Sequence, residues 1–253
     1  MPATVREIID DLGGLGLLAW DTVRYGVRRP LGFGLLIDQI YAIGVRSLSI
    51  VGIVALFTGL VIAVQTTHSL SNYGGQVFVG DLLALSLVRE LGPVLTSLMI
   101  AGRVGAGIAA EIGSMTVTEQ VDAIRALAAN PIKKLVVPRV LACVIMVPLL
   151  VVIASTLGIF GGLIIAVTEI DQAPAYYMRH VVTALGLADI ASGLIKSAVF
   201  AFVIAIIACH RGLNVTGGAA GVGGATTRAV VAASISILVS DFFITKALLW
   251  AFG

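Results

Sequence analysis

Charged side chains are scarce in this chain of 253 residues. Asp, Glu, Lys and Arg make up 12% of the sequence, whereas soluble domains carry about 25%. Hydrophobic residues make up 58%, which leaves too little polar surface to cover a water-soluble globule. The net charge of +2 is too small for a phosphate-binding surface, so no nucleic-acid partner is expected. These shortages exclude an ordinary soluble enzyme and indicate a membrane protein with basic loops on one side.

Residues typical of metal and redox sites are also few. The two cysteines, Cys143 and Cys209, lie inside apolar stretches, where we expect them to act as small hydrophobic side chains. There is no CxxC pair, and His68, His180 and His210 are too far apart to suggest a shared metal ion. No set of nucleophile and base converges in the sequence. We therefore predict no metal site, no cofactor in this chain and no catalytic residues.

A glycine-rich phosphate-binding loop is missing as well. Such a loop follows the pattern GxxxxGK[ST], in which backbone amides and a lysine hold the phosphates. The glycine-rich stretch 217–224 contains no lysine, and we interpret it as part of a flexible loop, 211–228, between two spans. Any ATP that drives this protein must therefore be bound by another chain.

Five apolar stretches are long enough to cross a bilayer, which takes about 20 residues per helix. An odd number of spans places the two ends of the chain on opposite sides. With the N-terminus inside, the inner segments hold most of the Lys and Arg residues, whereas Arg179 is the basic residue of the outer segments. The positive-inside rule then favours a cytoplasmic N-terminus and an external C-terminus for an all-α, polytopic membrane protein. The predicted spans are 47–65, 82–113, 140–168, 190–209 and 229–252.

Residues 1–46 precede the first span and are expected to form a unit separate from the transmembrane domain, 47–253. Apolar residues at roughly helical spacing, with arginines between them, predict an amphipathic helix on the inner leaflet. Pro30 is expected to bend or break this helix. The alternative is a soluble N-terminal tail. The pattern consists of Trp20, Val23, Val27, Leu31, Leu35 and Ile40, interleaved with Arg24, Arg28 and Arg29.

The segment 111–139 predicts a short amphipathic helix between the second and third spans, on the cytoplasmic side. Thr116 and Glu119 have the spacing of a capping box at a helix start. Asn130 stands before Pro131, and residues before proline avoid the helical region, so the helix should end there. Its polar face is acidic, which suits a protein partner better than anionic lipid. The apolar face consists of Val121, Ile124, Leu127 and Ala128.

Four runs in this part of the chain, in this order and spacing, are highly specific. They are RELGPVL from Arg89, AGRVGAGIAAEIG from Ala101, TEQVDAI from Thr118 and NPIKKLVVPR from Asn130. Together they resemble the MlaE family of ABC-transporter permeases. The five spans and the later run ATTRAVV from Ala225 are similar to the family as well, so the likeness covers about residues 40–253.

This resemblance implies a non-catalytic permease subunit in a bacterial inner membrane. It implies a homodimer that binds a cytoplasmic ABC ATPase, which carries the ATP, and a periplasmic MCE-domain protein. The expected cargo is phospholipid or a related lipid, moved between the inner membrane and the outer envelope. The helix at about 115–130 is similar to the family's coupling helix. The resemblance therefore places at or near the ATPase contact Glu111, Met115, Glu119, Asp122 and Arg125.

A lipid site is expected near the outer half of the second span. The resemblance supports lipid contact at Arg89, Glu90 and Leu91, with Glu90 facing a cavity at the dimer interface. The alternative for these charges is a structural polar network with the fifth span. Arg89 and Glu90 are adjacent, so they point in different directions and should not pair with each other. The outer mouth of the cavity is expected to be lined by Ile62, Gln65, Leu70 and Tyr73.

Other charged residues within the spans also need polar partners. Arg103 is expected to meet backbone carbonyls or Asp241, and Asp189 shares a helix face with Lys196. A proton-coupled secondary transporter that uses Glu90, Asp189 or Asp241 is the alternative function. An ATPase reading frame beside this one would favour the permease.

Overall fold

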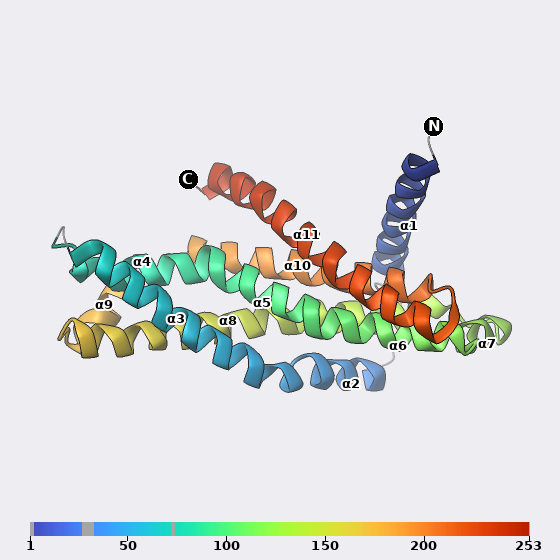
Figure 1. The fold of residues 1–253 in the computed structure, drawn as a ribbon, viewed down its shortest axis with the longest axis horizontal. Coiled ribbons are helices and arrows are strands. Elements are labelled where there is room, and N and C mark those ends of the chain that lie inside the picture. The colour runs from blue at the N-terminus through green and yellow to red at the C-terminus, as the bar shows by residue number, and fades with distance from the viewer. Residues whose placement is uncertain (1–2, 27–32, 72–73, 253) are drawn as a thin grey trace.

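The computed structural model describes residues 3–26, 33–71 and 74–252, and all secondary structure within these ranges is helical (Figure 1). Short 3-10 turns join some of the helices, and of the three π-helical segments two interrupt the second span and one begins the third. The α-helices are α1 (Ala3–Gly26), α2 (Phe33–Ile43), α3 (Leu48–Ser71), α4 (Val79–Ser86), α5 (Gly92–Ile100), α6 (Ala106–Val117), α7 (Gln120–Ala126), α8 (Val137–Glu169), α9 (Pro174–Ala184), α10 (Leu187–Leu213) and α11 (Gly218–Phe252). The 3-10 turns are η1 (Val45–Ser47) and η2 (Gln76–Phe78), and the π segments are η3 (Leu87–Leu91), η4 (Ala101–Gly105) and η5 (Ile132–Val136).

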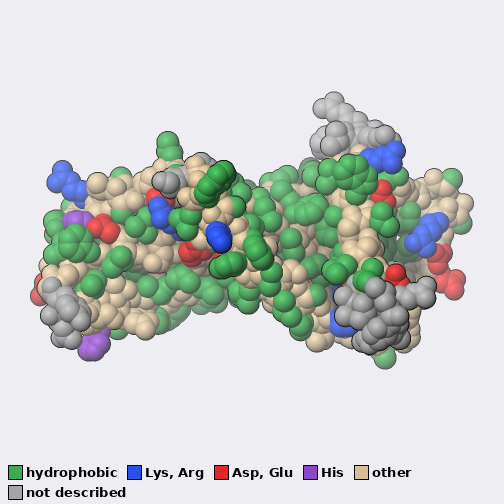
Figure 2. Space-filling view, turned by 90° about the horizontal axis from the view of Figure 1, so that it is seen from above, with side chains coloured by type: hydrophobic (Ala, Val, Ile, Leu, Met, Phe, Trp, Pro, Cys, Tyr) green, Lys and Arg blue, Asp and Glu red, His purple; other side chains and the backbone are tan. Residues whose placement is uncertain are grey.

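Five helical stretches are long and apolar enough to cross a membrane. Each contains or overlaps one of the predicted spans, so the expected all-α fold with five membrane helices is confirmed. Figure 2 shows exposed hydrophobic side chains over the middle of the molecule, with most charged side chains nearer its two ends. This distribution matches an apolar band between two polar boundaries. The stretches are Gly34–Ser71, Gln76–Val117, Ile132–Glu169, Leu187–Leu213 and Gly218–Ala251.

Helix α8 lies at the centre of the bundle and packs against α3, α2 and α10, while α6 packs against α10 and α11. Glycines allow the closest of these crossings. A Cβ atom on Gly59 of α3 would lie 1.9 Å from the carbonyl oxygen of Gly158 in α8, and one on Gly161 would lie 2.5 Å from the carbonyl oxygen of Leu56. Membrane helices pack by such close backbone contact, because lipid gives no hydrophobic drive for helices to associate.

The second span is one long helix with two π-helical interruptions, as its length suggested. The first, η3, directly precedes Gly92 and Pro93. Pro93 has no N–H to donate to the carbonyl four residues before it, which favours a local change of hydrogen bonding. Instead Gly92 N–H donates to the Leu87 carbonyl in the wider π pattern. A Cβ at position 92 would lie 2.4 Å from that carbonyl oxygen and 2.5 Å from Ser155 Oγ, so the motif requires glycine here.

The N-terminal region divides into two helices. Helix α1 leaves the bundle at a steep angle near the α7 end (Figure 1), and Asp11 ties it to Arg211 at the end of α10 with contacts of 3.0 and 2.6 Å. Trp20 and Val23 are exposed on α1. Helix α2 packs against α8. The predicted break at Pro30, with Val27, Arg28, Arg29 and Leu31, lies outside the described residues.

Two connecting segments differ from the sequence prediction. The glycine-rich stretch expected as a loop is helical from Gly218 onwards, and the connection is confined to 214–217. The outer segment before the fourth span contains α9. Tyr177 of this helix is fully buried, although aromatic residues in such a segment suit the membrane interface, and its hydroxyl donates to the Ile159 carbonyl at 3.2 Å. Helix α9 is therefore seated on the outer ends of α4 and α8.

Candidate functional site

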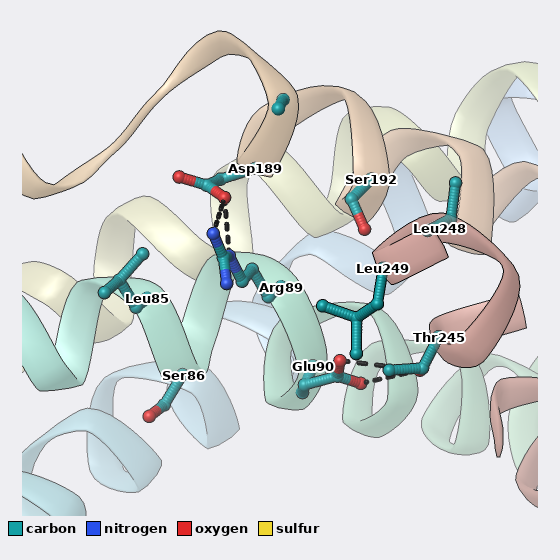
Figure 3. A pocket seen from close by; sticks show the side chains of 10 residues that line it. Leu85, Ser86, Arg89, Glu90, Asp189, Ser192, Thr245, Leu248 and Leu249 are labelled. Atoms are coloured by element: carbon teal, nitrogen blue, oxygen red, sulfur yellow. Dashed lines mark hydrogen bonds and ion pairs between the residues drawn. The ribbon is translucent and has the colours of Figure 1, made fainter. Parts of the chain in front are cut away.

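A cavity of about 460 Å³ opens between the second, fourth and fifth spans, where α4, η3, α10 and α11 meet. Figure 3 shows Arg89 extending from η3 toward α10, and the next residue, Glu90, extending toward α11. Apolar side chains from α4 and α11 complete the walls. The lining consists of Leu85, Ser86, Arg89, Glu90, Ala188, Asp189, Ser192, Thr245, Leu248 and Leu249.

Arg89 forms an ion pair with Asp189 at the start of α10. Its Nε donates to Asp189 Oδ1 at 2.5 Å, and a second guanidinium nitrogen contacts the same oxygen. Asp189 is only 6% exposed, and its other oxygen accepts a hydrogen bond of 2.8 Å from Gly186 N–H. Both oxygens of this buried carboxylate are therefore occupied, and the pair joins the second span to the fourth.

Glu90 takes part in a second, larger ionic group around Lys196. The Lys196 ammonium is fully buried and contacts three oxygens: one of Glu90, Thr245 Oγ1 at 2.6 Å and Asp241 Oδ1 at 3.1 Å. Glu90 and Thr245 accept hydrogen bonds from this ammonium, and Asp241 lies within ion-pair distance of it. Lys196 thus links the second, fourth and fifth spans, as expected of charges within a membrane bundle.

The local structure explains how four charges form two separate pairs. Asp189 and Lys196 are seven residues apart and lie on one face of α10. Arg89 and Glu90 are neighbours within the π segment, and each contacts a different residue of that face. They do not pair with each other, as predicted. The sequence alternative of a polar network with the fifth span is therefore present, and the same residues also line the cavity.

The cavity gathers only part of the expected lipid-contact set. Leu91 points elsewhere and lines a narrow crevice with residues of α3 and α5. Ile62 and Leu70 pack against the outer hydrophobic cluster, and Gln65 is exposed on α3. Tyr73 lies outside the described residues. Lipid contact at these positions stays a prediction, and none of the described ones lines this cavity.

Arg103 bonds to a side chain that was not among its predicted partners, which were backbone carbonyls or Asp241. Its Nη1 donates to Ser47 Oγ at 2.5 Å, across from η4 to η1. Asp241, which with backbone carbonyls was one of the two expected partners, contacts Lys196 instead. The prediction failed because both acids and bases are spaced along several helices, and only the packing of those helices decides which ones meet.

The helix between the second and third spans is shorter than predicted. Helix α7 has seven residues and begins after Glu119, whose φ of 59° lies in the left-handed region. Thr116 belongs to α6, and its hydroxyl donates to the carbonyls of Ile112 at 2.9 Å and Gly212 at 3.1 Å. The predicted capping box is therefore wrong, because Thr116 Oγ1 makes backbone contacts inside the bundle.

The end of α7 also differs. Ala128, with a φ of 56°, turns the chain before Asn130 is reached, and Leu127 is 80% exposed rather than part of a buried apolar face. Asn130 instead begins the next helical stretch, since its Oδ1 accepts a hydrogen bond of 2.9 Å from Ile132 N–H. A buried Val121 is the contact that holds α7 against the bundle.

The five predicted coupling residues separate into two groups. Glu111 lies on α6 and pairs with the buried Arg139 of α8 at 2.8 Å, so part of its role is to join the second and third spans. Met115 is half-buried near the end of α6. Glu119, Asp122 and Arg125 are exposed, and Asp122 pairs with Arg125 at 2.7 Å. The exposed end of the molecule therefore carries a short polar helix whose outer face is open.

The structure adds residues that the sequence did not single out. Thr245, one turn beyond Asp241 on α11, was missed, although its four-residue spacing from an intramembrane acid was a usable signal. At the outer end of the bundle, His180 Nδ1 lies 3.0 Å from Asp81 Oδ1 and joins α9 to α4. Within the described ranges, no group of His, Cys, Asp and Glu could hold a metal ion.

These features define a polytopic α-helical membrane protein with an ion-paired cavity within its spans and an exposed short helix at one end. Comparison with known proteins narrows the class. The family model described as "Permease MlaE" matches residues 36–247. A probable ABC transporter permease of Rickettsia felis is 44% identical over 240 residues, which are 95% of this chain and 93% of the relative. The chain belongs to the MlaE permease family.

Two further relatives match a shorter part of the chain. A probable ABC transporter permease of Synechocystis is 44% identical over 209 residues, covering 83% of this chain and 80% of the relative. The Arabidopsis thaliana protein trigalactosyldiacylglycerol 1, chloroplastic, is 36% identical over 210 residues, covering 83% of this chain and 60% of the relative. The protein is thus an ABC-transporter permease, a membrane subunit that implies an ATPase partner.

Proposed function

We propose that this permease moves phospholipid or a related lipid between a bacterial inner membrane and an outer envelope layer, together with an ATPase and an MCE-domain protein. The observation that carries the proposal is the cavity between the second, fourth and fifth spans. It combines apolar walls with two half-exposed, oppositely charged side chains, Arg89 and Glu90. Lipids have both an apolar body and a charged head group. The name of the Arabidopsis relative, which contains that of a glycerolipid, agrees with such a cargo.

The proposed assembly is a homodimer. Helix α11 is the candidate span with the smallest share of buried residues, 17%, compared with 44% for the second and third. Large side chains are exposed along it, among them Ile235, Leu238 and Phe242. A span so little covered by its own chain suits contact with a second copy, and the cavity beside its C-terminal half would then lie near the dimer interface.

The proposed coupling element is α7, which would bind the ATPase on the cytoplasmic side. Its outer face is polar and open, and it is joined to α6 by the turn at Glu119. Helix α6 continues through η4, α5 and η3 to Arg89 and Glu90. Closure of two ATP-bound ATPases would push on α7, tilt the second span and change the width of the cavity. An MCE-domain partner would receive or deliver lipid at the outer end.

The proposal is tested by mass spectrometry of the complex purified gently from its native membrane, with both proteins and lipids identified. We expect an ATPase, an MCE-domain protein and bound phospholipid to copurify. A permease that brings its ATPase but neither lipid nor an MCE-domain protein would contradict the lipid-transport proposal.

The coupling role of α7 has its own prediction. Asp122→Lys reverses an exposed charge and removes the pair with Arg125, which costs the fold little because surface pairs contribute about 0–1 kcal/mol. We expect the variant to fold but to lose ATPase from the purified complex. Glu169→Lys, an equal charge reversal at the exposed far end of α8, is the matched control and should keep it. If ATPase content and lipid-stimulated ATP hydrolysis are normal in Asp122→Lys, α7 is not the coupling helix.

A further inference from the structure

The polar atoms that the cavity offers to a ligand are few and can be counted. Asp189 is occupied by Arg89 and Gly186, and the Lys196 ammonium already contacts Glu90, Asp241 and Thr245. The half-exposed side chains are those of Arg89, 46% exposed, and Glu90, 41% exposed. The cavity therefore presents one positively charged hydrogen-bond donor and one negatively charged hydrogen-bond acceptor on adjacent residues.

The charges around the cavity do not cancel. Arg89 and Lys196 carry two positive formal charges, whereas Glu90, Asp189 and Asp241 carry three negative ones. The group therefore has a formal charge of −1, at a place where polar groups have little water around them. An anionic head group entering the cavity would raise this negative charge. A ligand that brings a cation next to Glu90 would neutralise it.

The lining also separates two kinds of cationic head group. Quaternary ammonium groups such as choline are recognised by aromatic side chains, through cation–π contact. The described cavity lining contains no Phe, Tyr or Trp. A primary ammonium has N–H donors and forms charge-assisted hydrogen bonds with a carboxylate. Glu90, with the Thr245 hydroxyl beside it (Figure 3) and the Ser192 hydroxyl elsewhere in the lining, suits the primary ammonium.

We infer that the cavity selects a phospholipid head group that carries a primary ammonium, with its phosphate at Arg89 and its ammonium at Glu90. This inference rests on the proposed lipid transport and names the head-group class that the same site prefers. The neighbouring charges on η3 match the two charges of such a zwitterion (Figure 3). An anionic lipid satisfies Arg89 alone, and a choline lipid adds no hydrogen-bond donor at the exposed side of the Glu90 carboxylate, which already accepts from Lys196 and Thr245.

The test uses the complete complex, reconstituted in vesicles of equal parts phosphatidylethanolamine, phosphatidylcholine and phosphatidylglycerol with identical acyl chains. The complex is then extracted gently, and its bound lipids are measured by mass spectrometry. We expect phosphatidylethanolamine to be enriched over each of the other two about threefold or more, the size of effect that one partly exposed charge pair gives. Bound lipid in the vesicle ratio would overturn the inference and leave lipid transport standing. A complex without any bound lipid would instead contradict the proposed function.

Three variants show whether Glu90 makes the contact. Glu90→Gln keeps the side-chain size, and Lys196 retains Asp241 and Thr245 as partners, so the bundle should still fold. Because the variant lacks the carboxylate that would bind the ammonium, we expect the enrichment to fall to about onefold. Asp241→Asn removes the same formal charge but leaves the Glu90 carboxylate in the cavity, and should keep the enrichment. Glu169→Gln, exposed at the far end of α8, is the control for charge alone. Equal loss in Glu90→Gln and Asp241→Asn would overturn the assigned contact, as would full enrichment in Glu90→Gln.

Discussion

Lys196 is the residue on which the ionic contacts of three spans converge. Its ammonium is fully buried and is shared by Glu90 and Asp241. Removing one partner of a buried ion pair is costly because the other charge is left uncompensated. We therefore expect Lys196→Met, which retains the apolar stem but leaves two carboxylates facing each other, to lower the free energy of unfolding by about 3–5 kcal/mol. Thermal unfolding of the purified protein in one detergent measures the loss.

Two further variants make this prediction specific. Lys246→Met removes an exposed lysine on the same helix as Asp241 and should leave the unfolding temperature nearly unchanged. Adding Asp241→Asn to Lys196→Met removes one of the stranded charges and should recover part of the stability. Equal unfolding temperatures for the wild-type protein and Lys196→Met would show that the buried ammonium does not hold the spans together.

Tyr177 gives a prediction about pH at the outer end of the bundle. Its phenol is fully buried in the protein, and this burial raises its pKa above the ordinary value of about 10. The unfolded chain then releases this proton at a lower pH than the folded chain does. The contribution of the protonated Tyr177 phenol to the free energy of unfolding is therefore fully present below pH 10 and is lost as the pH rises above it. Tyr177→Phe should remove this part of the alkaline loss of stability.

Unfolding temperatures at pH 8 and pH 11 check the effect of Tyr177. At pH 8 the Phe variant should lose about 0.5–1.5 kcal/mol, because the hydrogen bond to the Ile159 carbonyl is gone. Tyr176→Phe, at the exposed neighbouring position, is the control. An alkaline decline in Tyr177→Phe as steep as in the wild-type protein would contradict the assignment.

The residues of the site could be predicted only in part. Arg89 and Glu90 stand out in the sequence because a charge is rare within an apolar stretch. Their partners could not be derived, since Asp189, Lys196 and Asp241 are all available acids and bases and the pairing depends on how helices pack. Arg103 shows the same limit, because its partner is the small hydroxyl of Ser47, which carries no charge signal.

At the scale of elements, the crossing of α3 and α8 sets how closely the first and third spans can pack. Gly59→Ala would place a methyl group 1.9 Å from the Gly158 carbonyl oxygen, which is backbone and cannot rotate away. We expect the two helices to separate, at a cost of about 1–3 kcal/mol or more. Thermal unfolding measures this cost, and cross-linking between cysteines introduced on the two helices reports their separation.

A second glycine in a helix provides the matched control for this crossing. A Cβ on Gly107 of α6 meets no atom within 4 Å. Gly107→Ala should therefore gain about 0.5–1 kcal/mol from its better helix propensity. If Gly59→Ala and Gly107→Ala change the unfolding temperature in the same direction, close packing is not the reason for Gly59.

Helices that span the membrane were predictable because their length and apolar composition decide them. Short connections were not, because a few local contacts decide those. The capping-box spacing of Thr116 and Glu119 is genuine, but Thr116 is used by α6 and Glu119 adopts a left-handed turn. The glycine-rich stretch from Gly218 is helical despite its composition, and it packs against the end of α6, where Val222 lies 3.4 Å from the Cβ position of Gly113.

The whole molecule has two chemically different ends. Basic residues gather at the end that carries α7, on η5 and at the ends of α10 and α11, namely Arg125, Lys133, Lys134, Arg211 and Arg228. At the opposite end, α9 carries Arg179. In Figure 1 the α7 and α9 ends lie at opposite extremes of the bundle. The positive-inside rule therefore predicts that the α7 end lies in the cytoplasm.

Cysteine labelling tests this orientation without altering the native thiols, because Cys143 and Cys209 are fully buried in the bundle. Ala126→Cys on α7 and Thr183→Cys on α9 each place a new thiol at an exposed position. With the permease expressed without its ATPase, a membrane-impermeant maleimide should label Thr183→Cys in intact spheroplasts and Ala126→Cys only in inverted vesicles. The wild-type protein should stay unlabelled in both. Labelling of both variants from one side would contradict a membrane crossing by the third span, which separates α7 from α9. The reverse pattern would place the basic end outside and remove α7 from reach of a cytoplasmic ATPase.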